Sequence, residues 1–558
     1  MKENIVVNTD AIERDIFQHQ IVGIAEEMSV ALRRTAYSSI IWDMYDYACG
    51  IFNSNIEMIS QSETIPGQLG IMPLALKHMT ESIPMETWKQ GDILICNDPY
   101  RGCTHTMDVV LFCPIFNEGE LIAVSSTVAH HIDIGGKNPG SEGPDSRDVF
   151  AEGLIIPPSK LFFEGSPNQT IFDILASNVR QPEASSGDLR SQLSSCRTGE
   201  LRILELAKKY GNKKFSKLSQ LCIYYNEKYT RRAISKVKNG FYEASIFMED
   251  EVSSKKLVRI HSAIEVRDEE LYVDLSESDD QRPNGLNCPL ASTHSMVNFA
   301  VKCIFAPDLN QNHGCDKPVK IKTRHGSILD PKRPAAVSVR QLAQQGVADL
   351  ILKCLAPIGE KNSAAACQIS LPTFTWGGLD DRPNKVKEIG FAPYYIISDI
   401  IGGGMGGGPN SDGLSAVDTH SGNCAILSAE ILETLSPVRV LKTCLVKGSG
   451  GAGQYRGGLG IMRDYEILAS NLVMTGYCQQ TCTETFPWGF NGGSSGKGAM
   501  LIKNPGTDRE QNLGSKFDGL LFEQGDVLRV ISAGGGGWGD PLLRSQELIA
   551  LDKKENYC

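Results

Sequence analysis

The sequence predicts an α+β protein, because helical and strand-like segments occur in separate blocks along the chain. A long helical pattern opens the sequence, and short alternating strands follow it in two blocks. A Gly-rich, strand-like region occupies the residues after about position 372. Strand and helix do not alternate strictly, as a Rossmann-type α/β fold would require. We therefore expect a multi-layered fold with an N-terminal mixed α/β part that binds a metal and a Gly-rich, β-rich C-terminal part.

The first predicted element is an amphipathic helix over residues 9–36. Its apolar residues recur at alternating spacings of four and three, which lines one face of a helix: Phe17, Ile21, Ile24, Met28 and Ala31. Thr9 or Asp10 is suited to cap the start of this helix, and Glu13 stands where a capping box needs an acidic residue.

Strand signals follow the helix. Residues 47–52 and 57–59 predict a hairpin around the turn Asn53-Ser54-Asn55. Three further runs bounded by turn residues predict strands at residues 92–96, 109–116 and 121–129. The loops at the ends of such strands often carry functional side chains, because the sheet holds them rigidly.

The remaining pattern predicts helices over residues 187–235, short strands over 242–275, and two helical segments over 285–318 and 337–357. A chain of 558 residues is long enough to form several cores. We therefore expect three regions, which are an N-terminal metal-site region (1–235), a middle α+β region (236–371) and a Gly-rich, β-rich C-terminal region (372–558).

Composition restricts the class of protein. A hydrophobic content of 41% and a charged content of 22% are typical of a soluble globular protein. The net charge of −11 argues against a nucleic-acid partner, because phosphate binding needs a basic surface. The apolar runs are too short to span a bilayer, and no secretory signal is evident. Sixteen scattered cysteines are expected to be reduced thiols, so we expect a cytoplasmic protein with no membrane partner.

A cluster of histidines and aspartates around the last two predicted N-terminal strands indicates a transition-metal site. Only ten histidines occur in the chain, yet His105, His130 and His131 all lie here, together with Asp108 and Asp133. Imidazole combined with carboxylate suits Zn, Mn, Fe or Ni, whereas Mg or Ca would favour oxygen ligands alone. The residues by themselves leave an alternative open, in which hydrogen-bonded loop histidines and capping aspartates bind no metal.

Local geometry leaves the ligand set undecided. His105 and Asp108 would share a face only on a helix, so before a strand we expect His105 on a loop that curls back toward Asp108. His130 and His131 would point to opposite sides of a continuing strand, so only one of them can bind the metal without a kink. Asp46 precedes a strand, and its position alone favours a turn or a cap over a ligand.

Other motifs carry weaker signals. Cys103 could be a thiolate ligand or a nucleophile, but without a paired base a packing or supporting role is favoured. The glycines at 402–408 resemble a phosphate loop but are followed by turn residues, which favours a close backbone approach. The segment 492–498 has the wrong glycine-to-lysine spacing for a P-loop, so no nucleotide site is predicted. No Gly-x-Ser-x-Gly elbow supports a serine hydrolase.

A series of ordered motifs extends over nearly the whole chain. They begin with Asn97-Asp98-Pro99-Tyr100-Arg101-Gly102-Cys103-Thr104-His105 and end with Gly534-Gly535-Gly536-Gly537-Trp538-Gly539-Asp540-Pro541. Between these lie the motifs at 129–136, 178–182, 187–189, 326–331, 334–340 and 448–458. Together they resemble the hydantoinase B/oxoprolinase family, which includes B subunits of ATP-dependent hydantoinases and subunits of acetone and acetophenone carboxylases.

The resemblance implies a division of labour between two chains. An A-type partner, an actin-like ATPase, would use ATP and Mg to phosphorylate the oxygen of an amide or a ketone enolate. The B-type chain would hold a divalent transition metal, Zn or Mn ahead of Fe, with the ligands Asp46, His105, Asp108 and His130. His131 and Asp133 would be catalytic or supporting neighbours, with Asp133 as general base or as the group that orients an imidazole.

The function implied by the resemblance is that of the metal-containing B subunit of an ATP-dependent cyclic amide hydrolase. Such an enzyme opens a hydantoin, 5-oxoproline or lactam ring within a hetero-oligomer. The alternatives are a subunit of an ATP-dependent ketone carboxylase and a non-catalytic scaffold subunit. Trp42-Asp43-Met44 departs from the acidic–Arg pair of many hydantoinase-type members, and Cys103 replaces a residue that is commonly Gly. The choice between hydrolysis and carboxylation therefore stays open.

Overall fold

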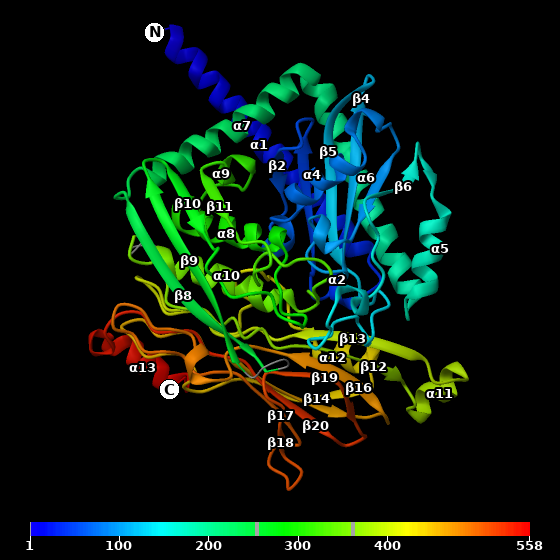
Figure 1. Ribbon diagram of the computed structural model, residues 1–558, viewed down its shortest axis with the longest axis vertical. Helices are drawn as coiled ribbons and strands as arrows, with labels where there is room; N and C mark the ends of the chain where they lie inside the picture. Colours follow the sequence, from blue (N-terminus) through cyan, green and yellow to red (C-terminus); the bar gives the residue numbers. More distant parts are fainter. Residues whose placement is uncertain (1, 252–255, 359–362, 558) are drawn as a thin grey trace.

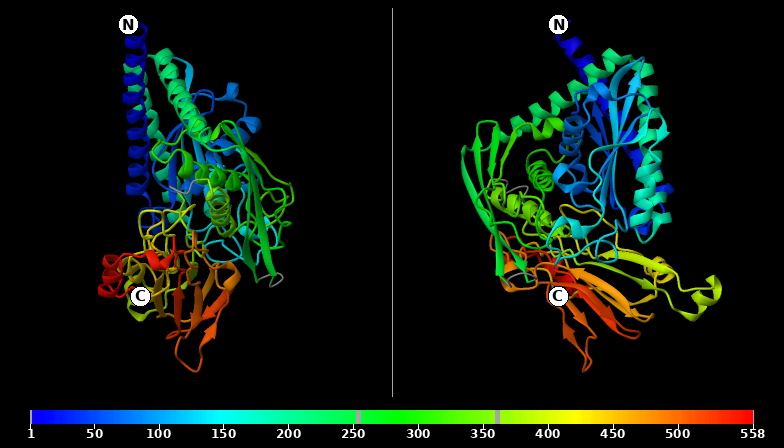
Figure 2. Two further views of the ribbon diagram at one scale, coloured as in Figure 1. Left: turned by 90° about the vertical axis from the view of Figure 1, so that its left-hand side faces the viewer. Right: turned by 45° about the vertical axis from the view of Figure 1, so that its right-hand side comes forward.

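The computed structural model describes residues 2–251, 256–358 and 363–557. It confirms the α+β class, with four β-sheets among the described residues (Figure 1). In Figure 1 the N-terminal sheet and its helices lie at the upper right and a second sheet lies at the left. The C-terminal strands form a layer beneath both, which the two views of Figure 2 also show. The division into three domains stays a prediction.

Helix α1 (Lys2–Thr35) confirms the long N-terminal helix. Its predicted apolar face packs into the protein, where Phe17, Ile21, Ile24 and Met28 are buried. The helix begins before Thr9, so the prediction that Thr9 or Asp10 caps its start is wrong. A capping box is a local signal, and here the chain on its N-terminal side is also helical.

The N-terminal sheet has seven strands in the order β2-β1-β5-β4-β3-β6-β7. Their bounds are β1 Tyr47–Asn53, β2 Met58–Gln61, β3 Ile93–Cys96, β4 Asp108–Asn117, β5 Glu120–His130, β6 Ser159–Phe163 and β7 Ser166–Pro167. The predicted hairpin and the three predicted strands are confirmed. Antiparallel pairing brings the start of β1, the end of β5 and the start of β4 to one edge of the sheet.

Helices cover both faces of this sheet. On one face α4 (Met72–Ser82) contributes Met72, Leu76 and Met79 to a core with the strands. On the other face, α5 (Gln169–Asn178) and α6 (Pro182–Tyr210) complete a second core. Strand β1 is buried along its whole length, because both of its faces are covered.

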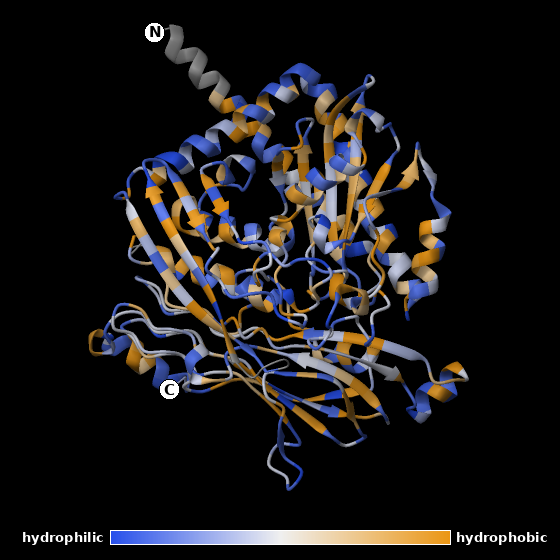
Figure 3. Cartoon of the chain, in the orientation of Figure 1, coloured by the Kyte–Doolittle hydropathy of each residue, from blue (hydrophilic) through white to orange (hydrophobic). Residues whose placement is uncertain are grey.

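The middle of the chain forms a second α/β layer. Helix α7 (Asn212–Ile234) leads into a four-stranded sheet in the order β11-β10-β9-β8. Its strands are β8 Gly240–Asp250, β9 Lys256–Arg267, β10 Glu270–Asp274 and β11 Val319–Lys322. Figure 3 shows hydrophobic and hydrophilic residues alternating along β8 and β9, as expected of strands with one buried face.

Two helices cover the buried face of the second sheet. They are α8 (Leu290–Phe305) and α10 (Arg340–Leu355), and they share a core with β8, β9 and β10. A short helix, α9 (His313–Asp316), follows α8. The two predicted helical segments are therefore confirmed in shortened form. Helix α10 is buried along almost all of its length, so side chains on several of its sides can line internal sites.

The C-terminal region contains two sheets, in the orders β13-β12-β16-β19 and β14-β15-β20-β17-β18. Their strands are β12 Thr373–Leu379, β13 Tyr394–Ile400, β14 Val438–Leu445, β15 Ile461–Ile467, β16 Leu472–Tyr477, β17 Met500–Lys503, β18 Gln511–Asn512, β19 Lys516–Phe522 and β20 Val527–Ile531. The region also has the helices α11 (Pro383–Ile389), α12 (Ala429–Leu435) and α13 (Gln546–Lys554). No helix in the described part of the chain is both long and apolar enough to cross a bilayer.

Extended glycine-rich segments connect these sheets and pack directly on one another. Their backbones are hydrogen-bonded together, as from Gly404 N–H to the Ala533 carbonyl (3.0 Å) and from Gly535 N–H to the Gly458 carbonyl (2.9 Å). A Cβ atom on Gly404 would overlap the carbonyl oxygen of Gly458. The glycines at 402–408 therefore permit a close backbone approach, as the sequence predicted.

Replacing Gly404 with Ala tests this packing. We expect Gly404→Ala to destabilise the fold by about 4 kcal/mol or more, because the overlap is relieved only by separating two hydrogen-bonded segments. Gly408→Ala is the matched control in the same segment, since the nearest atom to its added Cβ lies 4.0 Å away. Thermal unfolding followed by circular dichroism measures both variants. Equal melting temperatures would contradict the prediction.

Candidate metal centre

Strand register places three of the predicted ligands at one edge of the N-terminal sheet. Asp108 at the start of β4 pairs with His130 at the end of β5. Asp46 directly precedes β1, and its carbonyl oxygen accepts a hydrogen bond from the backbone N–H of His130 (3.1 Å). All three residues are buried. Antiparallel pairing thus gathers residues that lie far apart in the sequence.

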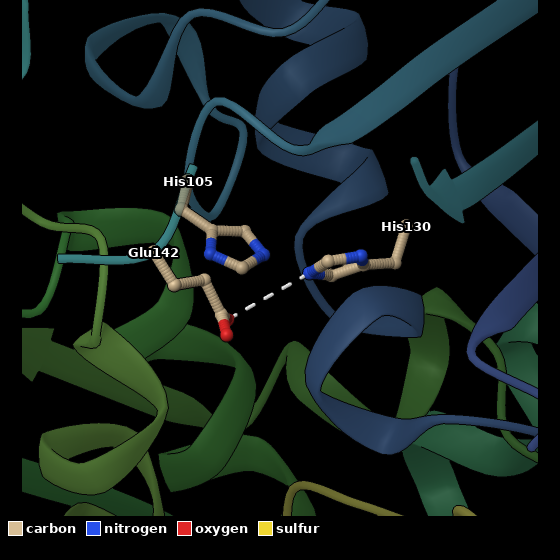
Figure 4. A group of neighbouring side chains, drawn as sticks. All are labelled: His105, His130 and Glu142. Atoms are coloured by element: carbon tan, nitrogen blue, oxygen red, sulfur yellow. Dashed lines mark ion pairs between the residues drawn. The ribbon is translucent and has the colours of Figure 1, made fainter. Parts of the chain in front are cut away.

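His105 and Glu142 complete the cluster from two loops. The backbone N–H of Asp108 donates to the carbonyl of His105 (3.3 Å), so the loop before β4 curls back as predicted. Glu142 comes from the loop after β5, and its Oε1 lies 3.8 Å from Nε2 of His130. Figure 4 shows the three side chains converging. Each of three residues offers one possible ligand atom, and these atoms lie within 4.8 Å of one another: His105, His130 and Glu142.

Each of the two histidines has its Nε2 atom beside a carboxylate of the cluster. His105 Nδ1 lies 3.2 Å from the carbonyl oxygen of Ser338, so this nitrogen donates and Nε2 keeps its lone pair. His105 Nε2 lies 3.3 Å from Oδ2 of Asp108, and it has no hydrogen-bond partner among the described residues. His130 turns its Nε2 toward Glu142, as Figure 4 shows. Buried polar atoms are normally satisfied. Imidazoles beside carboxylates therefore fit a transition-metal ion such as Zn, Mn or Fe.

Asp108 is held in place by three neighbours. Its Oδ2 accepts hydrogen bonds from the Thr104 hydroxyl and from Nη2 of Arg340 (3.0 Å). Its Oδ1 accepts a hydrogen bond from the side-chain amide of Gln68 (2.9 Å). The same amide donates to Oδ1 of Asp46 (2.8 Å) and so bridges the two carboxylates.

The clustered charges shift pKa values in opposite directions. Burial, together with the Asp108 carboxylate and partly offset by His130, raises the pKa of Asp46 to about 6. Burial opposes ionisation of Asp108 as well, but the nearby histidines and Arg340 hold its pKa well below the usual range. Burial lowers the pKa of His130, yet Glu142 and the two aspartates outweigh it and raise that pKa to about 9. The buried carboxylates are thus stabilised by nearby positive charge, which a divalent cation would supply.

A small cavity of about 50 Å³ is lined by Asp46, His105, His130 and Glu142. Three glutamines also line it, and their carbonyl oxygens have no hydrogen-bond partner among the described residues: Gln68, Gln341 and Gln344. A cavity of this volume holds a few water molecules rather than a ring-shaped substrate. The free acceptors are suited to orient such water.

His131 and Asp133, predicted to support catalysis, contact other groups. His131 follows His130 in the chain, so its side chain points the other way, and its Nε2 lies 3.0 Å from Oε1 of Gln192. Asp133 accepts hydrogen bonds from the backbone N–H and from the guanidinium of Arg180, both at 2.8 Å. Their catalytic roles stay a prediction. The observed contacts of Asp133 hold the loop after β5 in place.

Cys103 and Asp43 have structural contacts. Burial, together with the neighbouring Cys96, raises the pKa of the Cys103 thiol well above its usual range. The thiol is therefore protonated and packs in the core, the role that the sequence favoured. Asp43 accepts a hydrogen bond from the backbone N–H of Ser428 (3.2 Å), which ties the N-terminal part to the C-terminal part.

Three members of the cluster were missed by sequence reasoning. Glu142 lies in an irregular loop and has no regular spacing from the histidines. Gln68 lies in the one-turn helix α3 (Pro66–Leu69), and glutamine is a common surface residue with no chemical signature of its own. Arg340 is the last residue of a motif, 334–340, that carried the family resemblance, and this was the one signal pointing to it.

Glu152 fixes the loop that leads into α10. Its Oε1 accepts hydrogen bonds from the backbone N–H groups of Val337 and Ser338 (2.7 Å each). The Ser338 carbonyl in turn contacts His105. Oε2 of Glu152 is buried without a partner among the described residues. Burial, only partly offset by these hydrogen bonds, raises the pKa of Glu152 to about 8, so the group is protonated near neutral pH.

The α+β fold thus encloses a buried cluster of histidines and carboxylates with the chemistry of a candidate metal site. Residues 10–541 match the family model of hydantoinase B/oxoprolinase, and the chain belongs to this family. The putative B-type chain of a D-/L-hydantoinase from Pseudomonas sp. strain NS671 is 30% identical over 99% of this chain and 94% of its own length. A 5-oxoprolinase of Pestalotiopsis fici is 29% identical over 94% of this chain but only 41% of that longer protein.

Two solved structures share the fold. An ATP-dependent caprolactamase from Pseudomonas jessenii has a TM-score of 0.89 at 24% identity, over 98% of this chain and 94% of that chain. Acetone carboxylase in a nucleotide-free state has a TM-score of 0.88 at 19% identity, over 98% of this chain and 78% of that chain. At these identities the structures show a common fold, while the family membership rests on the sequence match.

Replacing Arg340 tests whether its positive charge stabilises the buried carboxylate of Asp108. We expect Arg340→Leu to lower the free energy of unfolding by about 3–5 kcal/mol, because it leaves a buried carboxylate without its cation. The double variant with Asp108→Asn should recover part of this loss. Arg202→Leu is the control, since Arg202 forms only exposed ion pairs worth at most about 1 kcal/mol. Urea unfolding measures all four chains, and an equal effect of both arginine variants would contradict the prediction.

The raised pKa of Glu152 predicts a pH dependence of stability. Between the unfolded pKa and about 8, the folded chain keeps a proton that the unfolded chain releases, so stability falls as the pH rises through this window. Glu152→Gln keeps an acceptor oxygen and removes the titration. We therefore expect the free energy of unfolding of the variant to increase relative to that of the wild type between about pH 5 and about pH 9. Urea unfolding measures this difference. An exposed control, Glu164→Gln, should show no such gain.

Proposed function

We propose that this chain is the metal-containing B subunit of an ATP-dependent cyclic amide hydrolase. It acts on a hydantoin, 5-oxoproline or lactam ring together with an A-type subunit that uses ATP and Mg. One observation carries the proposal, which is that His105, His130 and Glu142 are buried and each offers a possible ligand atom within 4.8 Å of the others. Membership of the hydantoinase B/oxoprolinase family connects that site with ATP-dependent amide chemistry.

The two-chain arrangement would overcome the low reactivity of an amide toward water. An amide carbon is a poor electrophile, and transfer of a phosphoryl group to the amide oxygen converts that oxygen into a good leaving group. The activated molecule reacts readily with water, so it benefits from a buried site that limits water access. A divalent metal, when bound at this centre, supplies Lewis acidity.

The residues of the chain divide the work around that centre. His105 and His130 hold the metal in both possible ligand sets. The family resemblance adds Asp46 and Asp108, whereas the geometry adds Glu142. A carboxylate that is not a ligand is free to act as general base.

Metal content tests the site. Elemental analysis of the purified chain should find a transition metal, and His105→Ala and His130→Ala should each lower its content at least tenfold, roughly the loss expected when a metal site is damaged. His261→Phe is the control, since His261 is similarly buried and lies in β9. Comparing Glu142→Gln with Asp108→Asn then separates the two ligand sets. Unchanged content in both histidine variants would exclude the proposed centre.

Product analysis with the A-type subunit tests the reaction. We expect ATP-dependent ring opening that needs no bicarbonate and that is lost in His105→Ala. A carboxylated product that forms only with bicarbonate would instead identify a ketone carboxylase. Full activity of the His105→Ala complex would indicate that this chain is a scaffold.

A further inference from the structure

A second cavity, of about 410 Å³, lies across the loop 417–424 from the metal centre. The loop separates the two cavities and contributes to both. Ser421 and Cys424 line the metal-side cavity, His420 lines the second cavity, and Asp418 lines both. The loop is held by hydrogen bonds, such as that from the Cys424 N–H to Oδ2 of Asp418 (2.8 Å). It is therefore an ordered wall between neighbouring cavities.

The two cavities differ in what they can hold. The metal-side cavity of about 50 Å³ has room for a few water molecules, whereas about 410 Å³ is typical of a small-molecule site. Apolar side chains form much of the wall of the second cavity, among them Phe299, Leu352 and Trp488. A cavity of this size that combines apolar walls with polar groups is the usual form of a small-molecule site.

Two buried polar groups stand together in the second cavity. Asp349, on α10, accepts a hydrogen bond at Oδ2 from the indole N–H of Trp488 (2.8 Å), which fixes its carboxylate. His420 packs edge-on against Phe299, with ring centroids 6.3 Å apart, and is 8% exposed. Its Nε2 lies 3.7 Å from Oδ1 of Asp349, beyond hydrogen-bond distance, and has no partner among the described residues. This nitrogen is therefore available to form a hydrogen bond with a molecule in the cavity.

The charges around the cavity select against anions. Asp349, Asp418 and Glu63 line it, and within the described parts of the chain no Lys or Arg does. A phosphate ester or a carboxylate-bearing molecule would be repelled by the carboxylates of Asp349 and Glu63, whereas a neutral molecule would not. The ligand that fits is neutral, largely apolar, and carries one hydrogen-bond donor beside one acceptor.

We propose that this cavity binds a neutral cyclic amide, such as a lactam or a hydantoin ring, before it is phosphorylated. A small ring holds the amide N–H and C=O on the same side. The N–H donates to Oδ1 of Asp349, the C=O accepts from the N–H at Nε2 of His420, and the ring lies against Phe299 and Leu352. This inference rests on the proposed function, and it narrows the substrate class to cyclic amides without a charged substituent.

Ligand binding to the full chain tests the site, with 2-pyrrolidinone as the probe and saturation-transfer NMR or calorimetry as the readout. We expect 2-pyrrolidinone to bind at least about tenfold more tightly than N-methyl-2-pyrrolidinone, which lacks the N–H donor. We expect 5-oxoproline, which carries a carboxylate, to bind more weakly as well. These comparisons use the wild-type chain and so do not depend on the folding of any variant.

Variants then locate the probe. His420→Phe and Asp349→Asn should each weaken binding of 2-pyrrolidinone about tenfold or more, while His261→Phe and His105→Ala should leave it unchanged. Circular dichroism establishes that each variant is folded. No binding to the wild-type chain, equal binding of the two lactams, or loss in His105→Ala but not in His420→Phe would each overturn the inference. Failure of the proposed function would appear separately, as metal content or amide hydrolysis that does not depend on His105 and His130.

Discussion

The buried carboxylate of Asp108 and the cation of Arg340 form the interaction on which the site depends. Asp108 lies at the edge of the N-terminal sheet, and Arg340 is the first residue of α10, which belongs to the core of the second sheet. Either buried charge without its partner would lower the free energy of unfolding by several kcal/mol. The pair therefore ties two layers of the fold together at the point where the histidines converge.

Helix α10 extends this connection beyond the candidate metal centre. Arg340 and Gln341 line the small cavity near its start, and Asp349 and Leu352 line the large cavity further along. One rigid helix thus fixes the distance between the two cavities. The glycine-rich segments hold the loop between the cavities from its other side. Val417 of that loop forms an antiparallel β-bridge with Gly403. Side chains in those segments would push this wall out of place.

Much of the fold could be predicted because its elements follow periodic patterns. The apolar face of α1 and the strands β3, β4 and β5 are visible as spacings of hydrophobic residues, and the structure confirms them. The cap at Thr9 or Asp10 failed because a local capping pattern does not show whether the preceding residues are helical as well. His105 and His130 could be found because histidine is rare in this chain. Glu142 could not be found, since one glutamate among many in an irregular loop has no signal.

The sequence by itself determined the α+β class, the family, and the window in which the metal-site candidates lie. These depend on residue type and on spacing along the chain, which the printed sequence contains. The tertiary structure alone decided which candidates meet, because strand register sets His130 opposite Asp108 and turns His131 toward Gln192. It also brought Glu142 and Arg340 to the centre and placed Asp349 beside His420. Such contacts join residues from distant parts of the chain, and only the packing of whole layers fixes them.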